Sequence, residues 1–107
     1  QALGKLRDVR AVDPLLPLLA DADRWARRGA AWSLGELGDP RAVDPLLPLL
    51  ADRKKDVRLT AADALGKLRD PRAISALSAA IEGEEEPEVR TAIRRALREI
   101  TGEAMVL

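Results

Sequence analysis

Hydrophobic residues recur along the chain with the period of helices that bury one face. In the clearest stretch, Val57, Ala61, Ala64, Leu65 and Leu68 follow one another at three- and four-residue spacing, the pattern of an amphipathic helix. A leucine-rich stretch interrupted by prolines precedes it. The pattern predicts two helices in each unit, a first over about 40–51 and a second that follows Asp52 and runs to about Arg69.

Aspartate–proline pairs mark the start of the first helix. Asp39 can accept the free amide groups of a first turn, and Pro40 has no N–H to lose there. Asp44 and Pro45 repeat this signal within the same segment. We therefore expect the first helix to be kinked or to restart near Pro45, with Pro48 still inside a tolerant first turn.

The chain repeats itself. Gly4, Gly35 and Gly66 lie 31 residues apart, and residues 8–21 and 39–52 agree at 13 of 14 positions. Self-similarity at such a period predicts a solenoid, in which each unit packs on its neighbours. We expect one all-α domain over residues 1–107, a right-handed α-α superhelix of about three units, divided into a partial second helix at 1–7, units at 8–38, 39–69 and 70–101, and a tail at 102–107.

The two ends of the array differ. In the last unit Arg94, Arg95 and Arg98 replace mostly small residues, which predicts a polar cap. The chain opens inside a second helix without such a cap, so we expect a fragment of a longer array; the alternative is self-association through this bare face. Near-identical units fit either a recent duplication, as in a thermophile, or a consensus design, and the divergent last unit favours a natural origin.

Composition excludes several functions. The chain is 47% hydrophobic and 34% charged, and its 18 basic residues balance 18 acidic ones, so no global attraction to phosphate or anionic lipid exists. The absence of His and Cys excludes their nucleophiles, Cys/His metal sites and disulfides. No apolar run is long enough for a membrane span, and no secretory signal is present. We expect a cytoplasmic, non-enzymatic protein without cofactor or metal.

Two motifs together resemble a known family. The pattern D-x-x-x-x-V-R-x-x-A-A-x-A-L-G-x-L covers 52–68, and D-x-R-A-V-x-P-L covers 39–46. They resemble the HEAT-like repeats of bilin lyase subunits and are similar to the engineered alphaRep scaffolds. The resemblance covers nearly the whole chain and implies an all-α superhelix whose second helices line a concave face.

The resemblance also implies a ladder of charged residues between neighbouring units. In HEAT families an Asp between the two helices and an Arg six residues later form it, and Asp21 with Arg27 and Asp52 with Arg58 match those positions. The last unit departs from the pattern, because it offers Glu82 or Glu84, and no Asp, before Arg90. We expect the ladder to be broken there.

The candidate binding surface follows from the implied concave face. Trp25 and Trp32 stand where the next unit has Asp56 and Asp63, so we expect both to be exposed, and their seven-residue spacing puts them on one helix face. Exposed Trp beside Arg is typical of a protein-interface hot spot. The alternative is that the indoles only cover the end of a missing unit. The candidate partner-binding residues are Arg24, Trp25, Arg28, Trp32, Asp56, Leu59 and Asp63, with Leu59 expected to be exposed as a third apolar contact.

Other charged positions predict structure. Glu36, Lys67 and Glu99 form an alternating row across the second helices, and Asp63 with Arg95 forms a pair; we interpret both as surface salt bridges. The acidic stretch 82–88 lacks the spaced oxygen ligands of a calcium loop. We expect a solvated loop whose glutamates favour the start of the next helix.

Three functions compete. The first is a protein–protein interaction scaffold that binds a protein or peptide on the concave face. The second is nucleic-acid binding, since some HEAT-like DNA glycosylases bind lesions with Trp, Arg and Asp on a concave face. Zero net charge and the lack of a basic stripe argue against nucleic acid as the partner. The third is a non-catalytic subunit of a bilin-lyase-like enzyme. If the chain had activity, Asp56 and Asp63 would be the only plausible acid or base groups.

Overall fold

Each unit of the protein consists of two helical segments, and in the first two units the first segment is broken while the second is continuous. The computed structural model describes residues 9–102, and every regular element in that range is helical. The first unit contains η1 (Val9–Ala11), α2 (Val12–Leu15), η2 (Leu16–Ala20) and α3 (Arg24–Leu37); the second contains η3 (Pro40–Ala42), α4 (Val43–Leu46), η4 (Leu47–Ala51) and α5 (Lys55–Leu68); the third contains η5 (Pro71–Ala73), α6 (Ile74–Gly83) and α7 (Pro87–Thr101), where η marks a 3-10 turn.

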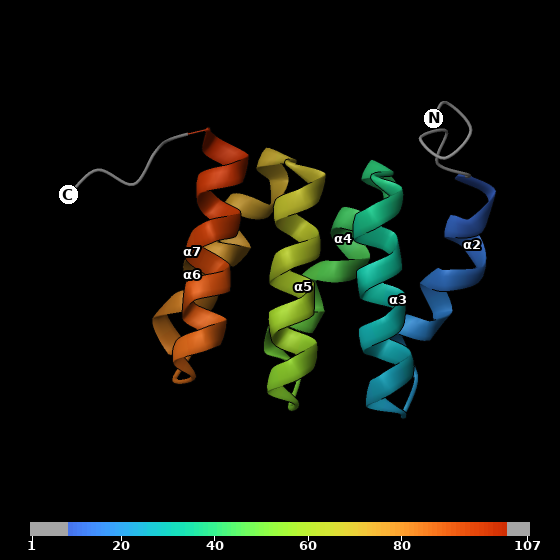
Figure 1. The fold of residues 1–107 in the computed structure, drawn as a ribbon, viewed down its shortest axis with the longest axis horizontal. Helices are drawn as coiled ribbons and strands as arrows, with labels where there is room; N and C mark the ends of the chain where they lie inside the picture. Colours follow the sequence, from blue (N-terminus) through green and yellow to red (C-terminus); the bar gives the residue numbers. More distant parts are fainter. Residues whose placement is uncertain (1–8, 103–107) are drawn as a thin grey trace.

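The helices form two layers. The second helices α3, α5 and α7 stand side by side; α4 and α6 lie behind them, and α2 lies beside α3 at the edge of the row (Figure 1). This arrangement confirms the predicted all-α solenoid and puts the second helices on one common face. The predicted partial helix at 1–7 and most of the predicted tail lie outside the described residues.

Prolines divide the first helix of each of the first two units. In the second unit the α-helical stretch ends at Leu46, and a 3-10 segment with Pro48 in its first turn follows. A proline amide cannot donate a helical hydrogen bond, so the tighter geometry replaces it. The predicted interruption of this helix is therefore present, although the change of helix type follows Leu46 and α4 runs through Pro45. The third unit has no proline between 74 and 83, and α6 runs through that range without interruption.

Side-chain caps start the units where an aspartate precedes a proline. Asp39 Oδ1 accepts a hydrogen bond from the amide N–H of Arg41 at 2.9 Å. In the third unit, Asp70 Oδ1 accepts one from the amide N–H of Arg72, also at 2.9 Å. The predicted second cap at Asp44 is wrong. The helix there begins one residue earlier, at Val43, and the carboxylate of Asp44 lies in its first turn without a capping bond.

The second helices begin later than predicted and end close to the predicted boundary. Helix α5 begins at Lys55, because Asp52 Oδ2 first accepts the amide N–H of Lys54 at 2.9 Å and closes a turn. The helix ends at Leu68, and Arg69 takes up the left-handed conformation (φ 53°) as the residue that follows it. In the first unit Gly38 (φ 73°) holds the equivalent position.

Close helix contact explains one glycine in the core. A Cβ added to Gly35 of α3 would lie 2.8 Å from Ala64 Cα and 2.9 Å from Ala64 Cβ on α5. The two helices therefore meet backbone to backbone at this point. Between the layers the core is aliphatic; its largest fully buried side chains are Leu34, Leu46, Leu65, Leu77, Ile93, Val12, Val43, Val57 and Val89.

Candidate functional site

A buried arginine links the first unit to the second. The guanidinium of Arg27 donates from Nε to Asp52 Oδ1 at 2.7 Å and from Nη2 to Asp52 Oδ2 at 3.1 Å. Its Nη1 donates to the backbone carbonyls of Asp21 (2.8 Å) and Ala22 (3.0 Å). Arg27 is only 6% exposed. The predicted ladder is confirmed here, with the arginine pairing to the aspartate of the following unit and to its own unit through carbonyl groups.

The ladder continues into the third unit. Arg58 donates from Nε and Nη2 to the two carboxylate oxygens of Glu84, at 2.8 and 3.1 Å, and from Nη1 to the carbonyl of Asp52 at 2.8 Å. The expectation of a broken ladder is wrong, because the longer Glu side chain takes the place of the Asp. The last arginine, Arg90, donates to the carbonyls of Ile81 and Glu84 and has no carboxylate partner among the described residues.

Both ladder carboxylates are held ionised. Burial raises the pKa of Asp52, but the hydrogen bonds from Arg27 and from the backbone of Lys54 outweigh it and leave that pKa below its ordinary value. The pKa of Glu84 is lowered in the same way, with burial opposed by Arg58. Arg27, Asp52, Arg58 and Glu84 thus form ion pairs that join neighbouring units.

The face formed by α3, α5 and α7, called here the second-helix face, exposes both tryptophans. Trp25 and Trp32 are each 57% exposed, which confirms the prediction from the repeat register. The guanidinium carbons of Arg24 and Arg28 lie 4.9 and 5.7 Å from the ring centre of Trp25, and the Lys67 ammonium lies 5.8 Å from that of Trp32. Each indole therefore contacts a cation and still offers a large apolar area to a partner.

Between the two indoles lies a hollow of about 340 Å³, called here the Trp hollow. Trp25, Arg28, Gly29 and Trp32 of α3 line it together with Thr60 of α5. The first four share one helix face because they follow the spacing i, i+3, i+4, i+7. Gly29 was not among the predicted site residues, although a glycine in mid-helix where the following units have other residues was a detectable signal.

The remaining candidate residues lie around the hollow and not in it. Asp56 is half-buried, with its carboxylate 3.9 Å from Arg24. Leu59 was expected to be exposed and is half-buried instead, because it packs against the core. Asp63 is also half-buried; burial raises its pKa, and the charges of Arg95 and Lys67 oppose that shift without cancelling it.

Salt bridges occupy most of the cations on this face. Lys67 pairs with Glu36, as predicted, and Lys55 pairs with Glu86 at 3.7 Å and Glu88 at 3.2 Å. The predicted pair between Asp63 and Arg95 is wrong: no ion pair joins them, although their charges interact. Arg28 contacts Trp25 but forms no ion pair with any described residue.

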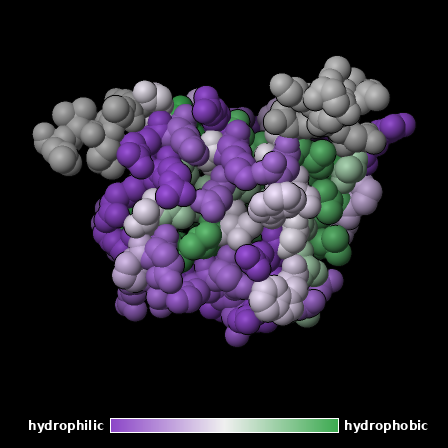
Figure 2. Space-filling view, viewed as in Figure 1, coloured by the Kyte–Doolittle hydropathy of each residue, from purple (hydrophilic) through white to green (hydrophobic). Residues whose placement is uncertain are grey.

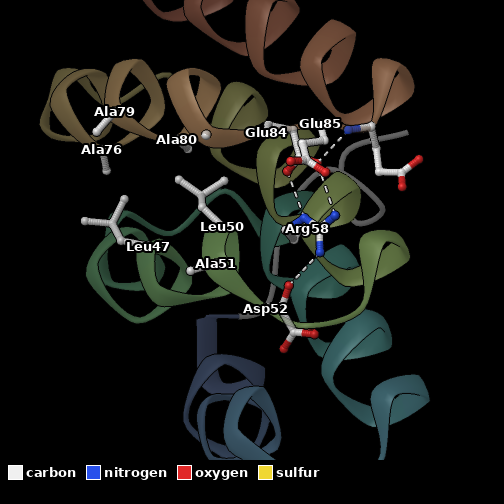
Figure 3. A pocket seen from close by; sticks show the side chains of 12 residues that line it. Leu47, Leu50, Ala51, Asp52, Arg58, Ala76, Ala79, Ala80, Glu84 and Glu85 are labelled. Carbon is white, nitrogen blue, oxygen red and sulfur yellow. Dashed lines mark hydrogen bonds and ion pairs between the residues drawn. The ribbon is translucent and has the colours of Figure 1, made fainter.

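A larger cavity, of about 610 Å³, lies away from the indoles, between η4 and α6 (Figure 3). Its walls are aliphatic, and the Arg58–Glu84 pair stands at one end. Those charged groups already satisfy each other within the ladder. The lining residues are Leu47, Leu50, Ala51, Asp52, Arg58, Ala76, Ala79, Ala80, Gly83, Glu84, Glu85 and Glu86.

The surface of the second-helix face is mostly hydrophilic, and apolar side chains gather at its edge over α2 (Figure 2). Among residues 9–102, no three or more Asp or Glu side chains lie together in the arrangement of a metal site. Within the same range, no helix combines the length and the apolar character that crossing a membrane requires.

Two-helix units joined by a buried arginine ladder define a helical repeat scaffold of the α-solenoid class. The sequence profile described as HEAT repeats matches residues 12–98, and the profile described as PBS lyase HEAT-like repeat matches residues 1–21. The chain belongs to the HEAT repeat family.

One similar solved structure contains a nucleic acid. The chain is 28% identical, with a TM-score of 0.74, to the crystal structure of epoxyqueuosine reductase with a tRNA-Tyr epoxyqueuosine-modified tRNA stem loop. The match covers 81% of this chain but only 28% of the length of that one. No curated protein matches the chain.

Proposed function

We propose that this protein is a non-catalytic scaffold that binds a protein or peptide on the second-helix face. The observation on which this rests is the pair of tryptophans, each 57% exposed, on one side of α3. Large aromatic side chains usually contribute to a core or an interface, and Trp with Arg dominates interface hot spots. Here the indoles stand outside the core and border a hollow.

The charge of the face supports a protein over a polyanion. Cations and carboxylates are equal in number at its outward positions, and several are already paired with each other. A nucleic-acid site gains affinity from unpaired cations along a groove. The cations are Arg24, Arg28, Lys55, Lys67 and Arg95, and the carboxylates are Glu36, Asp56, Asp63, Glu88 and Glu99.

The absence of catalysis is part of the proposal. The chain has no His or Cys, and the two candidate acid–base groups lie outside the Trp hollow. Asp56 is beside Arg24, and among residues 9–102 no second carboxylate is hydrogen-bonded to Asp63. General acid–base chemistry needs a group placed within reach of a bound substrate.

RNA binding is the second candidate, because the similar solved structure contains a tRNA stem loop. Indoles stack on bases, and Arg24 and Arg28 lie beside Trp25. This candidate predicts an affinity that falls steeply with salt, as counterion release demands.

The test compares peptides with RNA on the same protein. A random-peptide phage library is panned against the protein, and the enriched peptides are labelled and titrated while their fluorescence anisotropy is followed. A tRNA stem loop is titrated in parallel at about 50 and 200 mM salt, a range over which phosphate-dominated affinities change strongly. The variant is the double substitution Trp25→Ala with Trp32→Ala, whose unfolding midpoint should stay close to that of the wild type, because both side chains are exposed.

We expect enriched peptides to bind the wild type and to lose at least tenfold in affinity for the double variant, measured by anisotropy of the labelled peptide. Equal binding to both proteins, or no enriched peptide, would contradict the proposal. Salt-sensitive binding of the stem loop that depends on the indoles would establish the second candidate in its place.

A further inference from the structure

Close packing does not explain one glycine of α3. Gly29 lies in the interior of the helix and is exposed, and a Cβ added there would meet nothing within 4 Å. Glycine in a helix interior costs stability compared with alanine, because it loses more backbone freedom on folding. At Gly35 of the same helix, the missing side chain allows α3 to pack closely against Ala64 of α5. Gly29 makes no such contact.

The other two units carry a side chain at this position. By the repeat register, Thr60 and Ala92 correspond to Gly29. Both are buried, whereas Gly29 opens onto the Trp hollow with Trp25 one turn before it and Trp32 one turn after it. The missing side chain therefore leaves free the space between the two indoles.

The guanidinium of Arg28 beside the Trp hollow has no carboxylate partner among the described residues. Arg24, Lys55 and Lys67 have carboxylate neighbours, but Arg28, which lines the hollow, forms no ion pair with any described residue. An arginine that contacts an aromatic ring keeps N–H groups for a bidentate bond to a carboxylate.

We propose that the Trp hollow receives one bulky apolar side chain of a partner peptide, Leu or Phe, and that Arg28 binds an acidic residue next to it. The inference rests on the proposed protein-binding function and names the peptide chemistry that this function requires. The indoles supply apolar contact on two sides, Gly29 leaves the floor open, and Thr60 closes the side toward α5. A peptide with a basic residue at the same place would meet Arg28 with like charge.

The probes are fluorescein-labelled nine-residue peptides with Leu, Phe or Ala at the centre and Glu, Lys or Ser on both sides. Binding is measured by anisotropy to the full chain. The variants are Gly29→Leu, which fills the hollow, and Arg28→Gln, which removes the cation. Gly83→Ala is the matched control, because it also adds a side chain where nothing lies within 4 Å but stands at the end of α6.

We expect the Leu and Phe peptides flanked by Glu to bind at least tenfold more tightly than their Lys-flanked or Ala-centred counterparts. Gly29→Leu should weaken this binding at least tenfold without lowering the unfolding midpoint, and Gly83→Ala should leave it unchanged. Arg28→Gln should reduce the preference for Glu over Lys to less than threefold.

The failures of the two proposals are distinguishable. Binding that needs Trp25 and Trp32 but is equal in the wild type and Gly29→Leu would overturn the insertion and leave the protein-binding function standing. A preference for Glu that survives Arg28→Gln would overturn the assignment of the acidic residue. If neither these probes nor phage-selected peptides bind, both proposals are wrong.

Discussion

Replacing Gly35 with alanine tests the close packing of the second helices. The new Cβ would lie 2.8 Å from Ala64 Cα and 2.9 Å from Ala64 Cβ, well inside ordinary contact. Because the nearer atom belongs to the backbone of α5, no rotation of a side chain relieves the overlap. Helices α3 and α5 have to move apart, and the core between the units loses contact on both sides.

Two terms of opposite sign set the magnitude. Overpacking a core typically costs about 1–3 kcal/mol, and contact with backbone favours the upper half of that range. Alanine gains about 1 kcal/mol over glycine in a helix interior. The net loss for Gly35→Ala is therefore about 1–2 kcal/mol. At Gly29, where a Cβ meets nothing within 4 Å, only the gain of about 1 kcal/mol remains.

Urea unfolding followed by circular dichroism at equilibrium measures both variants against the wild type. The free energy of unfolding should fall for Gly35→Ala and rise for Gly29→Ala, so that the two differ by about 2–3 kcal/mol. In a thermal scan, 1 kcal/mol corresponds to about 4–8 °C for a domain of this size. The same chemical change in the same helix thus gives shifts of opposite sign.

A Gly35→Ala variant as stable as the wild type would contradict the close packing of α3 and α5, since the helices would then separate without cost. A destabilising Gly29→Ala would show that this position holds a packing contact, where the structure has nothing within 4 Å of the added Cβ.

Three further predictions concern charged groups. The pKa of Glu84 in the folded state lies below its ordinary value of 4.5, so its pair with Arg58 stabilises the fold above about pH 4.5. Glu84→Gln should therefore lower the urea midpoint at pH 7. The difference from the wild type should shrink as pH falls below about 4.5, because the carboxylate is then protonated. The pKa of Asp63 is raised above 3.8 by burial, so its charge is penalised at neutral pH; Asp63→Asn should raise the midpoint at pH 7, and an equal gain at pH 3 would contradict this. Asp39→Ala removes the bond to the Arg41 amide and should lower the thermal midpoint more than Asp44→Ala, whose carboxylate makes no capping bond.

Much of the site was predictable because the repeat provides a register. Asp56 and Asp63 showed that their counterparts Trp25 and Trp32 occupy outward positions, and the structure leaves both indoles exposed. The Trp hollow was not predicted, although the register places Gly29 where the other units carry Thr60 and Ala92. Residues of both α3 and α5 line the hollow, so it depends on how the two helices pack, which local spacing does not give.

Local spacing along the chain predicts the period of 31 residues, the two-helix unit and the capping aspartate before Pro40, because the units repeat that spacing. The ladder arginines were expected from the resemblance to HEAT-like repeats. Contacts between units follow from the packed fold alone: Arg58 meets Glu84, Leu59 packs against the core, and no ion pair joins Asp63 to Arg95. Such contacts depend on how closely neighbouring helices approach, and that distance is set by packing between units rather than by any one segment.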